Sequence, residues 1–504
     1  MSILKKCSLL IQYFVFVGLL LQSSLLVGSE LPYPFQIHLK GKTHEMQILH
    51  SGVTALAKRI EMIRSAKKSI ELETFILTPD KAGKVIVTEL IARAKAGVKV
   101  RLLLDKSITV IQFDEYYAKA IAEYGVEVRY YRRAVDLSSA QFRNHRKLLV
   151  IDDKQAVLGG RNIGDEYFDL HETYNYHDRD MWVSGPIVKG LRDSFDAYWN
   201  SDVVIEPPTP QIFAVSRLHR SYRRADPRYY VAIERTNKAK EFLSDNAQNR
   251  AVIKRVLSVG GTHLASRPIF ECHDVLYGTD RPAGKSNLGL MGAKYRDHFK
   301  LLGQLLKSEA AKTKSSLDFE TPYWILNPSW ERVILGLADQ KKAVRVYTNS
   351  LGATDAVYVS TAFYQKVYEY MDRGIVSVVH PAKYRTGQPY VLSNTPQIRY
   401  GVHSKTWLRD NMQVMIGSYN MDNRSDYYNT ELAIMCNDSP ELAQDLAENM
   451  KLRRDQGYRV VGFESAVKED GSSGEADIYG GADEGNIKLM KAIKLPVNWL
   501  ETLL

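Results

Sequence analysis

A short motif occurs twice in this chain, at positions far apart, and it limits the folds that the chain can adopt. Residues 145–152 read His-x-Lys-x4-Asp, and residues 403–410 repeat the pattern. Asn162 and Asn420 follow the two motifs at the same offset, each three residues after a Gly. Solenoid repeats have periods of about 20–50 residues, so a repeat at this distance predicts a duplicated domain.

Helix-like and strand-like segments alternate in the same order around both motifs. In the first half we predict helices at 53–65, 84–96 and 115–123 and strands at 70–77, 98–105, 126–131, 147–151 and 156–158. In the second half we predict helices at 330–338 and 361–371 and strands at 317–321, 344–348 and 375–379. This alternation predicts an α/β fold in which each half is a mixed sheet flanked by helices.

The length and composition fit a folded chain of several domains. An apolar fraction of 45% excludes a disordered chain, and 504 residues fit two or three domains at about 100–200 residues each. The predicted segments are a signal peptide or membrane anchor (1–29), a first lobe (30–205), a linker or insertion (206–300), a second lobe (301–455) and a tail with a possible interfacial segment (456–504).

The His-x-Lys spacing suits a strand, because alternation then points both side chains to one face. We therefore expect His145, Lys147, His403 and Lys405 to converge where two similar lobes meet around a pseudo-twofold axis. One imidazole can attack a phosphodiester while the second protonates the leaving oxygen, and lysine ammonium groups stabilise the phosphoryl oxygens. This chemistry needs neither a metal nor a cofactor, and we predict none.

Amide and hydroxyl groups after each motif can also contact a phosphoryl group. Asn162, Asn420 and Ser418 are the candidates for phosphate binding. Gly160 occupies the position of Ser418 in the first copy, so only the second half offers a hydroxyl there.

Two pairs of acidic residues stand in corresponding positions of the two halves. Asp180 and Glu431 each precede an apolar strand, and we predict that each bonds to a histidine ring and fixes its tautomer. Glu73 and Glu320 lie on equivalent strands, each followed by Thr. They indicate either a shared place near the site or a paired structural role between the lobes.

At these residues the chain resembles the phospholipase D superfamily, whose signature is the duplicated His-x-Lys-x4-Asp motif, and more narrowly the bacterial cardiolipin synthases of the C type. The matching stretches are 157–168, 348–355, 416–425 and 495–500. The resemblance implies a bilobed α/β fold, a site in the cleft between the lobes, and a covalent phosphohistidine. By family precedent His145 is the nucleophile, His403 is the general acid and base, and Asp152 and Asp410 are structural.

Two classes of substrate remain open for such a site. The first is a phospholipid, with phosphatidyl transfer to an alcohol or to water, and the second is nucleic acid. The net charge of +10 suits either anion. A nuclease would need a longer basic track across both lobes than the sequence offers, and an inactive scaffold would need a damaged motif. We therefore expect phospholipid and a membrane surface as partners, with no nucleic acid and no obligate protein partner.

The N-terminus and the cysteines bear on location. Lys5 and Lys6 precede an apolar run at 9–27, which predicts a secretory signal or an uncleaved anchor, and hence an exported or membrane-anchored protein. If Cys7 is removed with this leader, Cys272 and Cys436 remain, and the sequence leaves open whether they meet.

Overall fold

The computed structural model describes residues 35–106, 113–132, 142–207, 227–244, 246–283, 299–382, 398–472 and 475–492. These residues belong to one compact unit, Phe35–Leu504. The predicted leader, residues 1–29, lies outside the described residues.

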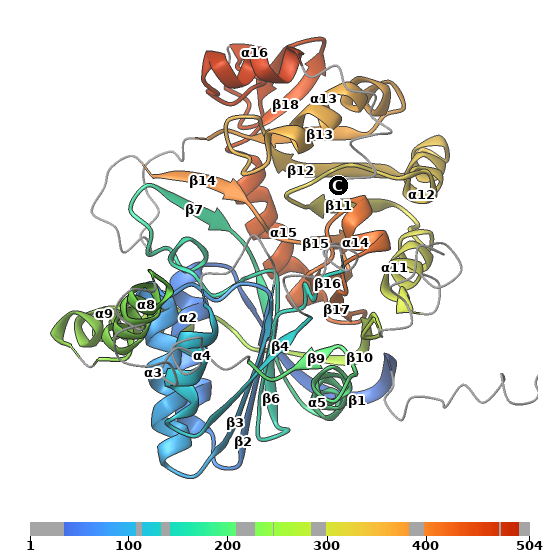
Figure 1. Ribbon diagram of the computed structural model, residues 1–504. Coiled ribbons are helices and arrows are strands. Elements are labelled where there is room, and N and C mark those ends of the chain that lie inside the picture. The colour runs from blue at the N-terminus through green and yellow to red at the C-terminus, as the bar shows by residue number, and fades with distance from the viewer. Residues whose placement is uncertain are drawn as a thin grey trace, which may run out of the picture. The chain divides into compact units, whose positions relative to one another are not determined.

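One large sheet of 18 strands organises the described residues, and a two-stranded sheet accompanies it (Figure 1). The large sheet consists of β1 (Gln36–Leu49), β2 (Ser69–Thr74), β3 (Lys99–Asp105), β4 (Val126–Tyr131), β5 (Leu148–Ile151), β6 (Gln155–Gly159), β8 (Asp180–Ser184), β9 (Val204–Ile205), β10 (Phe270–Thr279), β11 (Ser316–Glu320), β12 (Ala343–Asn349), β13 (Val376–His380), β15 (Thr406–Arg409), β16 (Gln413–Gly417), β17 (Leu432–Cys436), β18 (Tyr458–Gly462), β19 (Ser465–Lys468) and β20 (Glu475–Ala476). The small sheet pairs β7 (Tyr174–His177) with β14 (Arg399–Val402) in parallel.

The strand order of the large sheet is symmetric about its centre. Starting from the antiparallel pair of β1 and β10, the strands β8, β6, β5, β2, β3 and β4 follow on one side. On the other side β17, β16, β15, β11, β12 and β13 follow with the same relative directions. Two matching half-sheets are what a duplicated domain produces, and they confirm the predicted α/β fold with two similar lobes.

The lobes are joined more closely than the predicted boundaries suggested. β10 comes from residues 206–300, which we predicted as a linker or insertion, yet it pairs with β1 on one side and β17 on the other. Its sequence carries Glu, His and Asp among the apolar residues, so its alternation is weak. The predicted tail likewise supplies β18, which pairs with β13.

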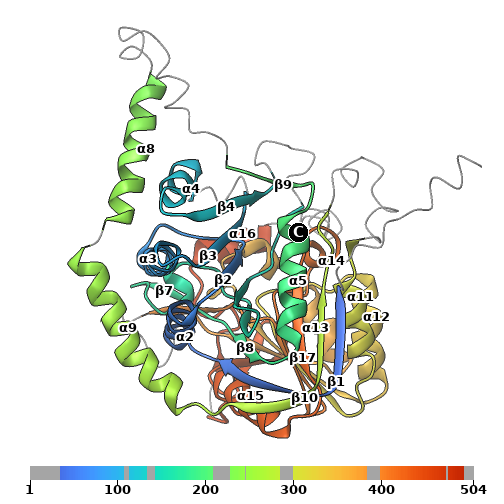
Figure 2. The same ribbon diagram turned by 90° about the horizontal axis from the view of Figure 1, so that it is seen from below.

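Helices cover both faces of the sheet. In chain order they are α2 (Gly52–Ser65), α3 (Lys81–Lys95), α4 (Glu115–Ala122), α5 (Ile187–Trp199), α8 (Pro227–Leu243), α9 (Ala247–Ser266), α11 (Leu302–Ala310), α12 (Pro328–Asp339), α13 (Val357–Asp372), α14 (Asn423–Tyr427), α15 (Pro440–Arg454) and α16 (Glu484–Ala492). Helices α2 and α3 lie on the opposite face of the first half-sheet from α5, and α9 packs against both α2 and α3 (Figure 2).

Three large hydrophobic cores hold these layers together. One lies under α2 and α3, and a second lies in the second half under α11 and α12. The third core is shared, because buried Leu191 of α5 and Leu446 of α15 pack with the central strands of both halves. Burying a leucine side chain contributes about 1.5–3 kcal/mol, so this shared core fixes the two halves against one another.

The Asp of each motif terminates its strand and ties it to the neighbouring strand. Asp152 and Asp410 lie at the tight turns of the β5–β6 and β15–β16 hairpins, with φ of 54° and 53°. The Asp152 carboxylate accepts from the backbone N–H groups of residues 67–69, at the start of β2. The Asp410 carboxylate accepts from the backbone N–H groups of residues 314–316, at the start of β11. Both residues thus have the structural position that the resemblance implied.

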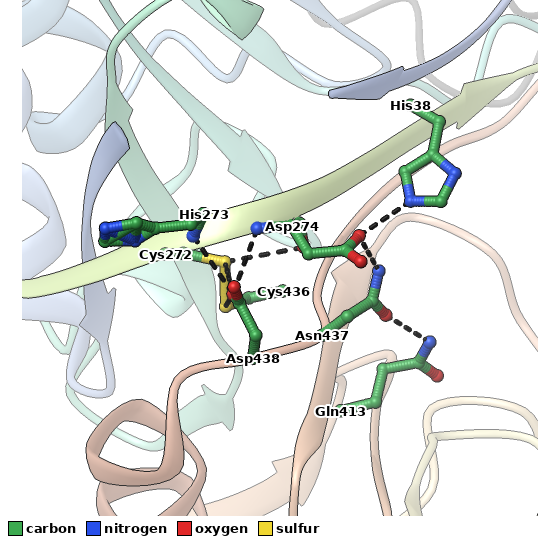
Figure 3. Close-up of a disulfide and its surroundings, with 8 residues drawn as sticks. All are labelled: His38, Cys272, His273, Asp274, Gln413, Cys436, Asn437 and Asp438. Atoms are coloured by element: carbon green, nitrogen blue, oxygen red, sulfur yellow. Dashed lines mark hydrogen bonds and ion pairs between the residues drawn. A yellow bond between two sulfur atoms is a disulfide. The ribbon is translucent and has the colours of Figure 1, made fainter. Parts of the chain in front are cut away.

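A disulfide fastens the central strand β10 to the second half-sheet. Cys272 on β10 and Cys436 on β17 form the bridge, with their Cα atoms 6.1 Å apart (Figure 3). Beside it, Asp274 accepts a hydrogen bond from Asn437 and pairs with His38 of β1. The pairing of these cysteines, which the sequence left open, is therefore present in the structure.

Loss of this bridge should lower stability substantially. The bridge closes a sequence separation of 164 residues, and disulfides over long loops stabilise folded proteins by about 2–5 kcal/mol. We expect the Cys272→Ala/Cys436→Ala variant to lose about that much free energy of unfolding, measured by urea denaturation. A reductant should destabilise the wild-type protein and leave this variant unchanged. Equal stability of the oxidised wild type and the variant would contradict the prediction.

Candidate active site

The two motif histidines meet because each half holds the histidine of the other. The backbone N–H of His145 donates to the backbone carbonyl of Thr430 at 2.9 Å, and the backbone N–H of His403 donates to the backbone carbonyl of His177 at 2.8 Å. Each carbonyl belongs to the residue directly before a buried acid. The two His-x-Lys segments, which lie directly before β5 and β15 and not on them, are therefore fixed by reciprocal backbone contacts across the pseudo-twofold interface.

Each histidine ring also bonds to an acid from the opposite half. Oε2 of Glu431 lies 2.9 Å from Nδ1 of His145, and Oδ2 of Asp178 lies 2.6 Å from Nδ1 of His403. All four side chains are buried. Because Nδ1 is occupied in both rings, Nε2 is the nitrogen available for chemistry. The predicted contact between Glu431 and a histidine ring is thus present.

The prediction for Asp180 is corrected by the structure. Its carboxylate accepts from Arg59 at 3.0 Å and from Arg161 at 3.1 Å, as part of a buried ion-pair group. Asp178 takes the place beside His403. The strand register agrees, because Asp180 opposes Gly159 as Ala433 opposes Gly417, which makes Asp178 the equivalent of Glu431.

Gly160 and Ser418 differ because the two acids differ in length and approach. A Cβ on Gly160 would lie 2.2 Å from Oδ1 of Asp178, so the first half requires glycine there. In the second half the Ser418 hydroxyl donates to Oε2 of Glu431, and Ser425, which the sequence did not single out, donates to Oε1 at 2.8 Å. Ser418 is therefore engaged with the acid, and its role in binding phosphate stays a prediction.

The two asparagines occupy related but unequal positions. Asn162 accepts from the N–H of Ile76 at 3.3 Å and donates to the hydroxyl of Tyr167 at 2.8 Å. The backbone N–H of Asn420 donates to the hydroxyl of Ser425 at 3.0 Å. The buried side-chain Oδ1 of Asn420 has no partner among the described residues. Their role in binding phosphate stays a prediction.

Both motif lysines lie against their own histidines. Nζ of Lys147 donates to the carbonyl of His145 at 2.6 Å, and Nζ of Lys405 lies 3.1 Å from Nε2 of His403. Burial lowers the pKa of Lys147 to about 7 and that of Lys405 to about 8, since a buried ammonium loses its hydration. The structure thus brings together the two His-x-Lys pairs, as predicted.

The two acid–histidine pairs differ electrostatically. Burial, together with the charges of Lys147 and Lys405, holds the pKa of His145 well below its usual range. Burial and Lys405 also lower the pKa of His403, but Asp178 opposes this shift. Burial raises the pKa of Glu431 to about 7. Asp178 is also buried, yet His403 and Lys405 hold its pKa below the usual value. His145 therefore lies among positive charges beside an acid of raised pKa, and His403 has the ionised partner.

Glu73 and Glu320 support the residues beside the histidines. Glu73 accepts from Asn144, which precedes His145, at 2.6 Å. Glu320 accepts from Ser404, which follows His403, at 2.6 Å, and from Arg179 at 2.6 Å. Both glutamates are fully buried. Both lie near the site. Glu320 also joins the two halves through Arg179, whereas the partners of Glu73, Asn144 and Arg146, belong to its own half.

Turnover should fall as the pH rises through about 7 to 8. Lys147 and Lys405, with pKa values of about 7 and about 8, lose their protons there and no longer stabilise a phosphoryl anion. We expect kcat/KM to decline on this alkaline limb. In the Lys147→Arg variant the guanidinium stays protonated. Its maximal kcat/KM should be lower than that of the wild type, and the alkaline decline of kcat/KM should begin at a higher pH. A profile that stays flat to pH 9 would contradict this account.

The fold and this geometry define a class: two-lobed α/β proteins with a duplicated His-x-Lys site of the phospholipase D type. Residues 59–199 and 306–453, more than half of the chain, match the family described as "Cardiolipin synthase, PLD-like domain". The chain belongs to this family, and the two matches fall within the two predicted lobes.

Individual relatives match most of the chain. Cardiolipin synthase C of Escherichia coli is 26% identical over 410 residues, which cover 79% of this chain and 82% of that protein. An uncharacterized protein of Helicobacter pylori is 26% identical over 445 residues, covering 83% and 81%. The crystal structure of phosphatidylserine synthase from Haemophilus influenzae superposes with a TM-score of 0.58 at 14% identity, covering 91% of this chain and 95% of that one. That likeness concerns the fold.

Proposed function

We propose that this protein is a phosphatidyltransferase. It cleaves the phosphodiester of a phospholipid and passes the phosphatidyl group to an alcohol, as a cardiolipin synthase does, or to water, as a phospholipase D does. One observation carries the proposal: two buried histidines, each bonded through Nδ1 to an acid of the other half, lie beside the two motif lysines, whose charges both act on His145. The cardiolipin synthase relative over most of the chain supports a lipid substrate.

The proposed reaction has two displacements. Nε2 of His145 attacks phosphorus, the bond to the headgroup oxygen breaks, and that oxygen takes a proton from Nε2 of His403. An acceptor hydroxyl then attacks phosphorus, gives its proton to Nε2 of His403, and the phosphorus–nitrogen bond to His145 breaks. The protonated lysines stabilise the phosphoryl oxygens in both steps.

The electrostatics support this division of roles. A nucleophilic imidazole must be unprotonated, and burial with Lys147 and Lys405 keeps the pKa of His145 low. An acid catalyst must hold a proton, and the carboxylate of Asp178 at 2.6 Å from Nδ1 favours the imidazolium form of His403.

We further propose that the protein acts outside the cytoplasm at a membrane surface. The disulfide of Cys272 with Cys436 supports an oxidising compartment, and the apolar run at 9–27 supports export or anchoring. Within the described ranges no helix has the length and apolar character needed to span a bilayer. Thiol labelling of acid-trapped, denatured cell extracts before and after reduction tests the compartment. Labelling of Cys272 and Cys436 before reduction would show that they are unbridged in the cell, which would contradict the oxidising compartment.

Product analysis from mixed vesicles tests the function. Purified protein with vesicles of phosphatidylglycerol and phosphatidylethanolamine should produce a cardiolipin-type lipid, identified by mass spectrometry. Release of phosphatidic acid alone would contradict transfer to lipid. Cleavage of oligonucleotides while vesicles stay intact would contradict the lipid substrate and favour a nuclease.

A further inference from the structure

The surroundings of the two histidines are not symmetric. The first half carries extra residues at 165–177, and their last strand, β7, pairs in parallel with β14 of the second half (Figure 1). This pairing fixes a first-half segment beside His403, since β14 ends directly before that residue. At the equivalent place beside His145, the described residues form a single parallel bridge, Asn144 with Thr430, and no two-stranded sheet, so His145 and His403 have different neighbours.

Two tyrosines of this segment lie against the His403 ring. The ring of Tyr176 is centred 4.9 Å from that of His403, and the ring of Tyr167 is 5.2 Å away, edge to face. The two tyrosines stack on one another at 4.9 Å. They form a rigid aromatic wall on the side of the site that holds the proposed acid and base.

An exposed carboxylate continues this wall. Asp355, two residues before α13, accepts hydrogen bonds from Tyr176 at 3.2 Å and from Tyr323 at 3.0 Å. An ionised carboxylate offers about four acceptor positions, so two tyrosine hydroxyls leave it able to accept more. Its charge reaches the site, because it raises the pKa values of both His403 and Lys405 against the larger effect of their burial.

The His145 side has the opposite character. Phe75 lies edge to face with His145 at 5.1 Å. The positive charge of Arg424 contributes to the lowered pKa of His145, after burial and the site's own lysines. The site therefore has an anionic, hydrogen-bond-accepting side at His403 and a cationic, apolar side at His145.

We propose that Asp355, Tyr176 and Tyr323 form the subsite for the headgroup alcohol. This inference rests on the proposed function. In a phosphoryl displacement the attacking and leaving atoms lie in line, so attack by His145 places the leaving oxygen beside His403. The acceptor alcohol enters by the same route in the second step. The subsite therefore selects headgroups that donate hydrogen bonds, such as a polyol or a primary ammonium, and disfavours one that places an anion against Asp355.

A substrate with a chromogenic leaving group separates the acceptor step from the first step. Phosphatidyl-p-nitrophenol in vesicles reports attack through release of nitrophenol, and the ratio of phosphatidyl alcohol to phosphatidic acid reports acceptor selection. We expect Asp355→Asn to lower that ratio about tenfold with glycerol and with ethanolamine, since a hydrogen bond to a charged group is lost. Tyr176→Phe should lower it less, because it removes only a hydroxyl that holds Asp355. The matched control Asp339→Asn, at an exposed carboxylate paired with Arg373, should keep the wild-type ratio.

The acceptor series distinguishes the two headgroup classes. Choline carries the charge of ethanolamine without N–H donors, so wild-type protein should prefer ethanolamine to choline if the ammonium is recognised by hydrogen bonding. A loss confined to glycerol in Asp355→Asn identifies a polyol subsite, and a loss confined to ethanolamine identifies an amine subsite. Ratios unchanged within twofold for both acceptors would overturn the inference while wild-type transfer upholds the proposed function. Absence of any phosphatidyl product from the wild type would instead overturn the function itself.

Discussion

Replacing either motif histidine should reduce steady-state turnover by on the order of 10³–10⁴-fold or more. The two variants should stop at different steps of the reaction. In His145→Ala no nitrogen can attack phosphorus, so no covalent adduct forms. In His403→Ala a leaving group as good as nitrophenol needs no acid, so attack proceeds, but the acceptor lacks a base. We expect labelled phosphatidyl-p-nitrophenol to leave its phosphatidyl group on His403→Ala, detected by intact-protein mass spectrometry.

A surface histidine offers the matched control for this experiment. His273 is exposed on β10, away from the motif strands, and His273→Ala should turn over like wild type without accumulating adduct. An adduct on His145→Ala but not on His403→Ala would exchange the two roles. Turnover with no adduct on any variant, even after rapid quenching into alkaline denaturant that preserves a phosphorus–nitrogen bond, would contradict covalent catalysis.

The sequence predicted the architecture well because the duplication constrains it twice. The elements predicted in the second half repeat the order of those in the first, and every predicted element is present in the structure. The convergence of His145 with His403 follows from the same symmetry. The pairing across halves could not be predicted, because alternation on a strand gives the face of a side chain and not the strand that it faces.

The misplaced acid has a similar origin. Asp178 and Asp180 are two residues apart, and a shift of two residues on a strand keeps a side chain on the same face. The pattern of polar and apolar residues therefore cannot separate them. Packing distinguishes the two acids. Asp180 forms ion pairs with Arg59 and Arg161, while the glycine at position 160 leaves room for the side chain of Asp178. That glycine, where the second copy has serine, was the signal in the sequence.

Substitution of these two acids should separate catalysis from stability. In Asp178→Asn the amide no longer favours the imidazolium of His403 and can hold the wrong tautomer, so we expect kcat to fall by about 10²–10⁴-fold in a folded protein. In Asp180→Asn the buried Arg59 and Arg161, 5% and 1% exposed, lose their counter-charge, which should cost about 3–5 kcal/mol of folding free energy.

The two variants serve as each other's controls, since the chemical change is the same at positions two residues apart. Urea denaturation and kcat, measured on the same preparations, give four values to compare. We expect Asp178→Asn to keep most of its stability and lose turnover, and Asp180→Asn to lose stability first. The opposite result would be loss of turnover at full stability in Asp180→Asn, with Asp178→Asn behaving like wild type. In that case Asp180 orients His403, and catalysis does not use the contact between Asp178 and His403.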